Sequence, residues 1–266
     1  MANLPDRATV MAFYLLFSLF PMLLMLATIA DLLWTPHDFF GVADPFLRAL
    51  PPAARDTVRY FVSDLLSGSG GTTLFSFSTI GLLWSMSAYF RATIENVGQL
   101  NGTSGRRTFW SALWLSLRLA VISVVITFVL TVVVFGPFVV EWLASHIPYF
   151  QSVATDLWVS LQWPLICLTM LLSLDYLYYA CPARRRKWRW ISVGSVLTTA
   201  LCVFASLGLA YYAVGFGNYQ KIYGALGGVI LLLLWAWLIN MAILLGAVVN
   251  SAVSEAVDKL LEIAPS

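Results

Sequence analysis

The chain has 266 residues, of which 60% are hydrophobic, 15% aromatic and 11% charged, and its mean hydropathy is +0.84. Soluble domains are about 45–50% apolar and about 25% charged. This composition excludes an ordinary soluble enzyme, a disordered chain and a disulfide-stapled secreted domain, and it indicates a polytopic membrane protein. The formal net charge is +2, and the three cysteines, which have no CxxC spacing, are interpreted as small apolar side chains.

Six apolar windows are predicted to be transmembrane helices, each of which needs roughly 20 residues. They are Val10–Leu33, Leu74–Phe90, Ala112–Phe138, Trp158–Tyr179, Ile191–Val214 and Ala225–Val249. The second window is short, and the amphipathic stretch Arg91–Leu100 extends it. Helices are favoured because lipid requires every backbone polar group to be satisfied within the segment and no alternating barrel pattern is present. We expect the first window to be a retained span and not a cleaved signal peptide.

Positive charge is distributed unevenly between the two sets of connections. One set holds ten Lys and Arg residues and the other holds four. The positive-inside rule therefore places both termini in the cytoplasm, and an even number of spans agrees with this orientation. Half of the ten lie in one short run, Arg184, Arg185, Arg186, Lys187 and Arg189. We expect this run to contact anionic lipid headgroups, at about 1 kcal/mol per cation, and we expect no nucleic-acid binding.

The long connection after the first span contains a predicted interfacial helix. Within Ala53–Ser67, apolar residues recur at helical spacing opposite Arg55 and Arg59. This pattern is typical of an amphipathic helix lying on the outer membrane surface. We therefore predict an all-α fold, with residues 1–266 forming one membrane domain of six spans plus this helix.

Two ionisable residues lie inside predicted spans, where each costs roughly 2.5–3.5 kcal/mol on insertion scales. Arg118 follows Arg107 by eleven residues, and Asp175 precedes Arg184 by nine. Both are therefore expected within roughly 10–15 Å of the inner interface. One interpretation is an Arg118–Asp175 pair or a shared polar cavity. The alternative is that each side chain snorkels separately to the headgroups.

Three further features of the spans have both a structural and a functional interpretation. Pro21 is expected to kink the first span, with Ser18 helping to satisfy the freed backbone, and the kink is either a static packing feature or a hinge. Asn240 is expected to bond to another helix or to line a polar pathway. The Gly-rich turn before the last span offers polar donors from Asn218, Tyr219 and Tyr223. Its glycines, Gly224, Gly227 and Gly228, are expected to allow close helix packing.

Catalytic and metal-binding patterns are absent from the sequence. The only histidines are His37 and His146, and there is no HExxH, GxSxG or P-loop motif and no cluster with metal-ligand spacing. We therefore predict no catalytic residues, no metal site and no cofactor.

Several segments resemble the YihY/BrkB family of bacterial inner-membrane proteins. They are AFYLLFSLFP at 12–21, LWSMSAYFR at 83–91 with Glu95 and Asn96 following, YQKIYGALGG at 219–228, Leu234-Trp235, and LGAVVN at 245–250. The resemblance covers nearly the whole chain in the right order. It implies a six-span inner-membrane protein with cytoplasmic termini. The family more often has an acidic residue where Val248 stands, so no charge-based role is expected there. Its ribonuclease BN label is regarded as mistaken, and its virulence label supplies no mechanism.

The function predicted from these residues is of transport type, for an anionic or amphipathic envelope component such as a lipid or a small metabolite. In this interpretation Arg118 attracts the anionic group, Asp175 balances it or binds a proton, and Pro21 allows rocking. Glu95, Asn96, Asn240 and the Gly-rich turn are further candidates for the cavity. The alternative is a non-transporting membrane scaffold that binds partners. A homo-oligomer is compatible with either interpretation.

Overall fold

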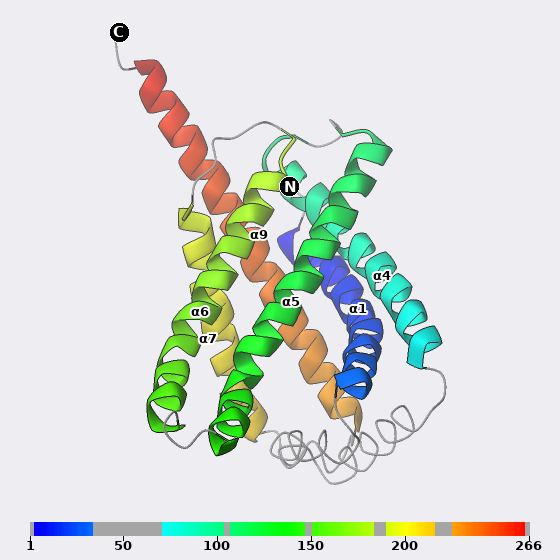
Figure 1. Ribbon diagram of the computed structural model, residues 1–266. Helices are drawn as coiled ribbons and strands as arrows, with labels where there is room; N and C mark the ends of the chain where they lie inside the picture. Colours follow the sequence, from blue (N-terminus) through cyan, green and yellow to red (C-terminus); the bar gives the residue numbers. More distant parts are fainter. Residues whose placement is uncertain are drawn as a thin grey trace.

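The computed structural model describes residues 3–33, 71–103, 107–146, 151–183, 190–215 and 225–263. Within these ranges the chain forms six helices and no strand, so the all-helical prediction is confirmed. The helices are α1 (Leu4–Leu33), α4 (Gly71–Leu100), α5 (Phe109–His146), α6 (Gln151–Ala180), α7 (Val193–Gly215) and α9 (Ala225–Ile263). Successive helices run in alternating directions, and both termini lie at the same end of the bundle, here named the termini end (Figure 1).

Five of the helices contain a segment that is long and apolar enough to cross a membrane. These segments are Leu4–Met25, Phe109–Val133, Ser160–Ala180, Val193–Tyr212 and Gly227–Ala256. The sixth helix, α4, is not among them, and its sequence is rich in Ser, Thr and Gly. It is nevertheless one continuous helix of 30 residues that includes the predicted extension Arg91–Leu100. The predicted interfacial helix at Ala53–Ser67 lies outside the described residues.

Two helices are much longer than the spans predicted for them. α5 has 38 residues and α9 has 39, and at about 1.5 Å per residue each is close to 60 Å long. A bilayer core is about 30 Å thick. The hydropathy windows therefore predicted the apolar part of each helix but not its ends. The C-terminal part of α9 projects beyond the other helices at the termini end (Figure 1).

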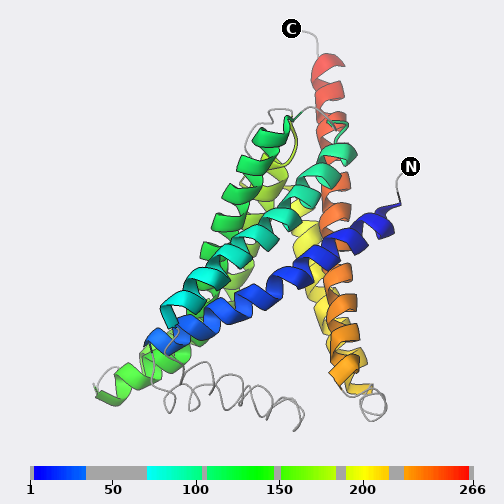
Figure 2. The same cartoon turned by 90° about the vertical axis from the view of Figure 1, so that its right-hand side faces the viewer.

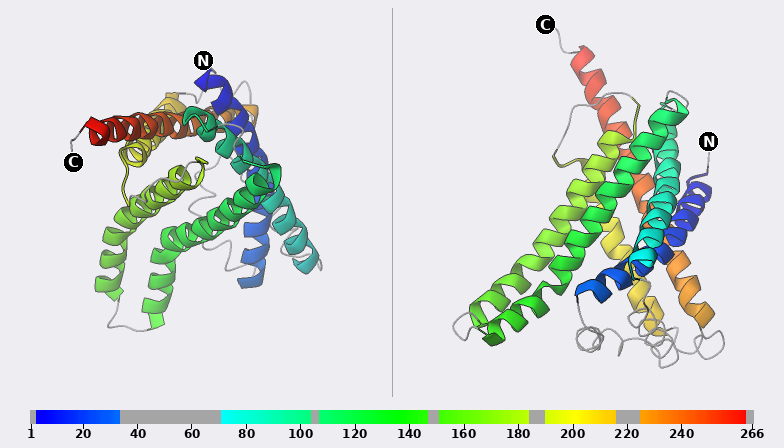
Figure 3. Two further views of the ribbon diagram at one scale, coloured as in Figure 1. Left: turned by 90° about the horizontal axis from the view of Figure 1, so that it is seen from above. Right: turned by 45° about the vertical axis from the view of Figure 1, so that its right-hand side comes forward.

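The helices pack as a closed ring of neighbouring pairs. α1 contacts α4 and α9, α4 contacts α5, α5 contacts α6, and α7 contacts both α6 and α9. α4 also contacts α9 across the ring. Figure 2 shows α1 crossing α9 obliquely, and Figure 3 shows α5 and α6 running side by side. α4 and α5 consequently lie between α1 on one side and α6 on the other.

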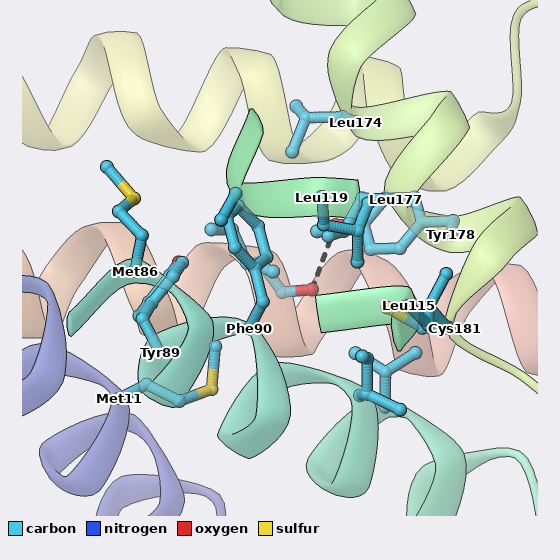
Figure 4. Close-up of a cluster of buried hydrophobic side chains, with 14 of the residues drawn as sticks. Met11, Met86, Tyr89, Phe90, Leu115, Leu119, Leu174, Leu177, Tyr178 and Cys181 are labelled. Atoms are coloured by element: carbon cyan, nitrogen blue, oxygen red, sulfur yellow. Dashed lines mark hydrogen bonds between the residues drawn. The ribbon is translucent and has the colours of Figure 1, made fainter. Parts of the chain in front are cut away.

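A buried cluster of side chains joins five of these helices, α1, α4, α5, α6 and α9. Met11 comes from α1, and the other members labelled in Figure 4 include Met86, Tyr89 and Phe90 of α4, Leu115 and Leu119 of α5, and Leu174 and Leu177 of α6. Lipid tails are as apolar as these side chains, so the cluster stabilises the bundle mainly through van der Waals packing.

α4 ends in a turn that sets the position of the following residues. Gly102 adopts a left-handed conformation with φ of 63°. The Thr103 amide donates to the Gly98 carbonyl at 2.8 Å, and the Gly102 amide donates to the Gln99 carbonyl at 3.1 Å. This is the Schellman pattern of helix termination, which favours glycine at the left-handed position. It holds Thr103 next to the start of α5.

The closest helix crossing in this part of the bundle is between α7 and α9, at Gly194 and Gly246. A Cβ atom added at Gly246 would overlap Thr198 and lie 2.6 Å from the Tyr178 hydroxyl and 2.7 Å from the Gly194 carbonyl oxygen. By contrast, a Cβ atom added at Gly227 or Gly228 would meet no described atom within 4 Å. The close crossing that the structure describes on the last helix is thus at Gly246, whereas Gly224, one of the three glycines predicted to pack closely, lies outside the described residues.

Candidate functional site

A cavity of about 610 Å³ lies at the termini end, between α1, α4, the start of α5 and the segment that follows α6. Its polar lining comes from Arg91, Glu95, Thr103 and Arg107, and apolar side chains such as Val10 and Ile94 form other parts of its wall. This volume is within the range of small-molecule sites, about 300–1,000 Å³. The cavity therefore combines charge with apolar surface.

The two arginines in this cavity differ in what they already bind. Nη2 of Arg107 donates to the carbonyl oxygens of Ala180 at 2.8 Å and Pro182 at 3.0 Å, at the C-terminal end of α6. Its Nε is buried without a hydrogen-bond partner, and so is the Nε of Arg91. Arg91 forms neither a hydrogen bond nor an ion pair with any described residue. A buried donor without a partner costs about 1–3 kcal/mol, and an anion in the cavity would remove that cost.

Glu95 and Asn96, both predicted as site residues, face different neighbours. Glu95 lines the cavity, is exposed, and accepts a hydrogen bond of 3.3 Å from Nε2 of Gln99. Asn96 accepts a hydrogen bond of 3.3 Å from Nη1 of Arg7, which joins α4 to α1. Nε of Arg7 is the third buried arginine donor without a partner at this end. Glu95 is thus the only acidic side chain in the described lining of the cavity.

Cys181 forms part of the cavity wall directly after α6, and its side chain is buried. Burial raises the pKa of this thiol from 9.0 to about 12, although the positive charge of Arg107 acts in the opposite direction. The side chain is therefore a neutral thiol at physiological pH. It is suited to packing and poorly suited to nucleophilic chemistry.

The structure does not bring Arg118 and Asp175 together as an ion pair. Arg118 is exposed on the outward face of α5, next to the exposed Trp114 one turn earlier. Asp175 is buried on α6, with 3% of its surface exposed. No salt bridge between these two described residues is present, and neither lines the cavity. The alternative, that each side chain snorkels separately to the headgroups, is compatible with the exposed position of Arg118 but does not describe the buried Asp175.

Asp175 instead holds the beginning of α7. Its Oδ1 accepts the Ser192 amide at 3.0 Å, and Ser192 and Ser195 bond reciprocally at 3.2 Å as a helix-capping pair. Asn250 of α9 donates from Nδ2 to Ser192 Oγ at 2.9 Å and accepts the Gly194 amide at 3.0 Å. The Asp175 carboxylate therefore links α6 to the start of α7, and Asn250 links the same segment to α9. The other oxygen of Asp175, Oδ2, is buried without a partner.

Asn240 forms the interhelical bond that its sequence position predicts. Its Oδ1 accepts the Tyr89 hydroxyl of α4 at 3.0 Å, and its Nδ2 donates to the Ala236 carbonyl of its own helix at 2.8 Å. Its side chain is fully buried and does not line the cavity. These contacts favour structural linkage of α4 to α9 over a place on a polar pathway.

A family model described as Virulence factor BrkB matches residues 1–266 of this chain. The chain belongs to this family. The ribonuclease-like protein YfkH of Bacillus subtilis strain 168 is 27% identical over 253 residues, which cover 92% of this chain and 88% of YfkH. A UPF0761 membrane protein of Stenotrophomonas maltophilia strain K279a is 25% identical over 216 residues, which cover 79% of this chain but only 47% of that relative. The chain thus spans about half the length of the Stenotrophomonas protein. No solved structure matches the chain.

The first span of this BrkB-family chain contains Pro21 within a continuous helix, α1. A Cβ atom at Gly81 of α4 would lie 3.6 Å from Pro21 Cβ, so the proline ring faces a glycine on the neighbouring helix. Ser18 was predicted to help satisfy the backbone that proline leaves free. Its hydroxyl donates to the carbonyl of Leu15, three residues earlier in the same helix. The packing of Pro21 against α4 fits the interpretation of a static feature.

Several predicted residues lie outside the described part of the chain. They are Asn218, Tyr219 and Tyr223 of the Gly-rich turn and the basic run Arg184, Arg185, Arg186, Lys187 and Arg189. Among the described residues, no group of three or more His, Cys, Asp or Glu side chains is arranged to hold a metal.

The arginines of the cavity were not predicted as site residues, because in the sequence they stand out only as positive charges that mark membrane orientation. A usable signal was present: Arg91 and Glu95 are four residues apart, so they lie on one face of a helix. That Arg107 approaches the same face follows only from the packing of α4 against α5.

Proposed function

We propose that this protein is a transport-type protein of the bacterial inner membrane that binds and moves an anionic or amphipathic component through the cavity at the termini end. The observation that carries the proposal is a cavity of about 610 Å³ with two arginines in its lining, each with a buried, unpartnered Nε. Buried donors without partners mark a place where a ligand supplies the acceptors. We assign the attraction of the anion to Arg91 and Arg107, which line the cavity, and not to Arg118 as first predicted, because Arg118 faces outward.

The proposed membrane arrangement is six crossings with both termini in the cytoplasm, so the cavity opens on the cytoplasmic side. The placement of both termini at one end of the bundle supports an even number of crossings (Figure 1). The excess of Lys and Arg in the connections at this end supports the orientation. A C-terminal fusion to green fluorescent protein should fluoresce in cells, whereas a C-terminal alkaline phosphatase fusion should be inactive. The opposite pair of results would reverse the orientation.

The test of movement uses proteoliposomes containing a fluorescent, NBD-labelled phosphatidylglycerol, an anionic lipid. The protein should accelerate exchange of this probe between leaflets, measured as loss of fluorescence after addition of external dithionite. Arg91→Gln should slow the exchange by about tenfold or more, because the anion loses a charged partner. Arg118→Gln is the matched control, since it removes an exposed arginine outside the cavity, and it should leave the rate unchanged.

The alternative function is a scaffold that binds a ligand or partner without moving it. Unaccelerated exchange together with Arg91-dependent binding would favour this alternative and end the transport proposal. The ribonuclease-like description belongs to YfkH. Our proposal assigns no catalytic step to this chain.

A further inference from the structure

We infer that the cavity at the termini end recognises a phosphate group attached to an apolar part, and that Arg91 is its principal ligand. This inference rests on the proposed function and names the class of molecule that the same cavity takes. It follows from the charge of the lining, the supply of free donors and the position of α5.

The charged groups of the lining have an excess of positive charge. Arg91 and Arg107 face one acidic side chain, Glu95. Glu95 forms no ion pair with either arginine among the described residues, and its carboxylate accepts from Gln99 instead. The guanidinium groups are therefore not neutralised by the protein around them, and the cavity favours an anion.

The free donors match a phosphate better than a carboxylate. Among the described residues, Arg91 has no hydrogen-bond partner, whereas Arg107 uses Nη2 on the carbonyl oxygens of Ala180 and Pro182 and has no described partner at Nε or Nη1. A guanidinium carries five N–H donors. A carboxylate offers two oxygens in a plane, while a terminal phosphate offers three outside its ester link, in a tetrahedral arrangement that two arginines can bind from different directions.

Backbone geometry adds to the same preference. Phe109 and Ala112, in the first turn of α5, both line the cavity. The N-terminal, positive end of α5 therefore borders the space where the anion would lie. This contribution is independent of the arginine side chains.

The remaining lining indicates that the ligand also has an apolar part. Val10 and Tyr14 of α1 and Ile94 of α4 form walls beside the polar groups. A free inorganic phosphate would leave these walls without a partner. A lipid headgroup with the first part of its chains and a soluble phosphorylated metabolite with an apolar moiety both fit this description.

The experiment titrates the full chain in dodecyl maltoside micelles, by calorimetry, with hexyl phosphate, hexanoate and inorganic phosphate. Hexyl phosphate should bind most tightly, with hexanoate and inorganic phosphate each weaker by about tenfold or more. Arg91→Gln should lose most of the hexyl phosphate affinity, and Arg91→Lys, which keeps the charge but not the fork of donors, should lose about tenfold. Arg118→Gln should bind as the unmodified protein does. Unchanged melting temperatures would establish that the variants are folded.

The outcomes separate this inference from the proposed function. Equal, Arg91-dependent binding of hexanoate and hexyl phosphate would overturn the phosphate preference and leave an anion-binding cavity. Absence of binding by all three probes would overturn both proposals. Addition of phosphatidic acid to the micelles distinguishes the sources: competition with hexyl phosphate supports a lipid phosphate, and no competition supports a soluble phosphorylated ligand.

Discussion

The crossing of α7 and α9 provides the sharpest prediction for stability, because one added methyl group should separate the two helices. In Gly246→Ala the new Cβ atom overlaps Thr198 and lies 2.6 Å from the Tyr178 hydroxyl. These two side chains form hydrogen bonds at the point of the crossing. Tyr178 bonds to Thr198 at 2.7 Å and to the Ile243 carbonyl at 2.9 Å, and Thr198 donates to the Ala242 carbonyl at 3.2 Å.

Gly246→Ala should lower the free energy of unfolding by about 2–4 kcal/mol. Overpacking costs about 1–3 kcal/mol, and an interhelical hydrogen bond in a membrane protein is worth about 0.6–1.7 kcal/mol. The assay is equilibrium unfolding in mixed micelles with increasing dodecyl sulfate. Gly208→Ala in α7 is the control, because a Cβ atom there meets no described atom within 4 Å, and it should be neutral or stabilising by up to about 1 kcal/mol. If Gly246→Ala were as stable as Gly208→Ala, the crossing would not be as close as described.

Three further predictions concern buried polar groups. Tyr89→Phe should lower the free energy of unfolding by about 1–2 kcal/mol, because Asn240 loses its partner on α4. In the same assay, Asp175→Leu should lower the free energy of unfolding by about 1–2 kcal/mol, because it removes the acceptor for the Ser192 amide at the start of α7. Asp175→Asn keeps an acceptor oxygen and should lower the free energy of unfolding less. Burial raises the pKa of Cys181 to about 12, and only the thiolate form reacts with iodoacetamide. At about pH 8 the reagent should therefore modify Cys181 roughly a thousandfold more slowly in the folded than in the unfolded protein. The rate of labelling of the folded protein should rise with pH. Peptide mass spectrometry measures the last effect, and equal labelling in both states would contradict it.

The apolar elements of this fold follow from the sequence because membrane helices are specified by local composition. Every predicted window coincides with a helix, apart from Ile191 and Ser192 just before α7. The ends of the helices do not follow in the same way. α9 continues to Ile263 because polar residues remain helical outside the apolar stretch, and hydropathy does not register this continuation.

The site was less predictable because its residues come from segments that are distant in the sequence. Arg118 and Asp175 were predicted as site residues from their depth in the membrane, which can be estimated from the sequence. The side of the helix on which each residue lies, facing the bundle or facing outward, depends on how the helices pack. The outward face of α5 and the buried face of α6 were set by contacts of α5 with α4 and of α6 with α7. For Asn240 the structure shows one of the two predicted alternatives, a bond to a neighbouring helix, but Asn240 is not in the lining of the described cavity, where it was also a candidate.

Buried polar atoms without partners are concentrated around the cavity. Of the six such atoms in the described residues, four lie at the ends of α1, α4 and α5 that surround it, namely Nε of Arg7, Arg91 and Arg107 and Oδ1 of Asn101. Other donors of two of these side chains are bonded: Arg107 caps the C-terminal end of α6, and Arg7 donates to Asn96. These bonds offset part of the free-energy cost of burying the two arginines. Arg91 has no such bond to a described residue, so an uncharged side chain at this position would remove a burial penalty from the bundle. Hydrogen bonding within the described bundle therefore does not account for the charge at position 91, whereas the proposed anionic ligand and the excess of cations at the termini end both would.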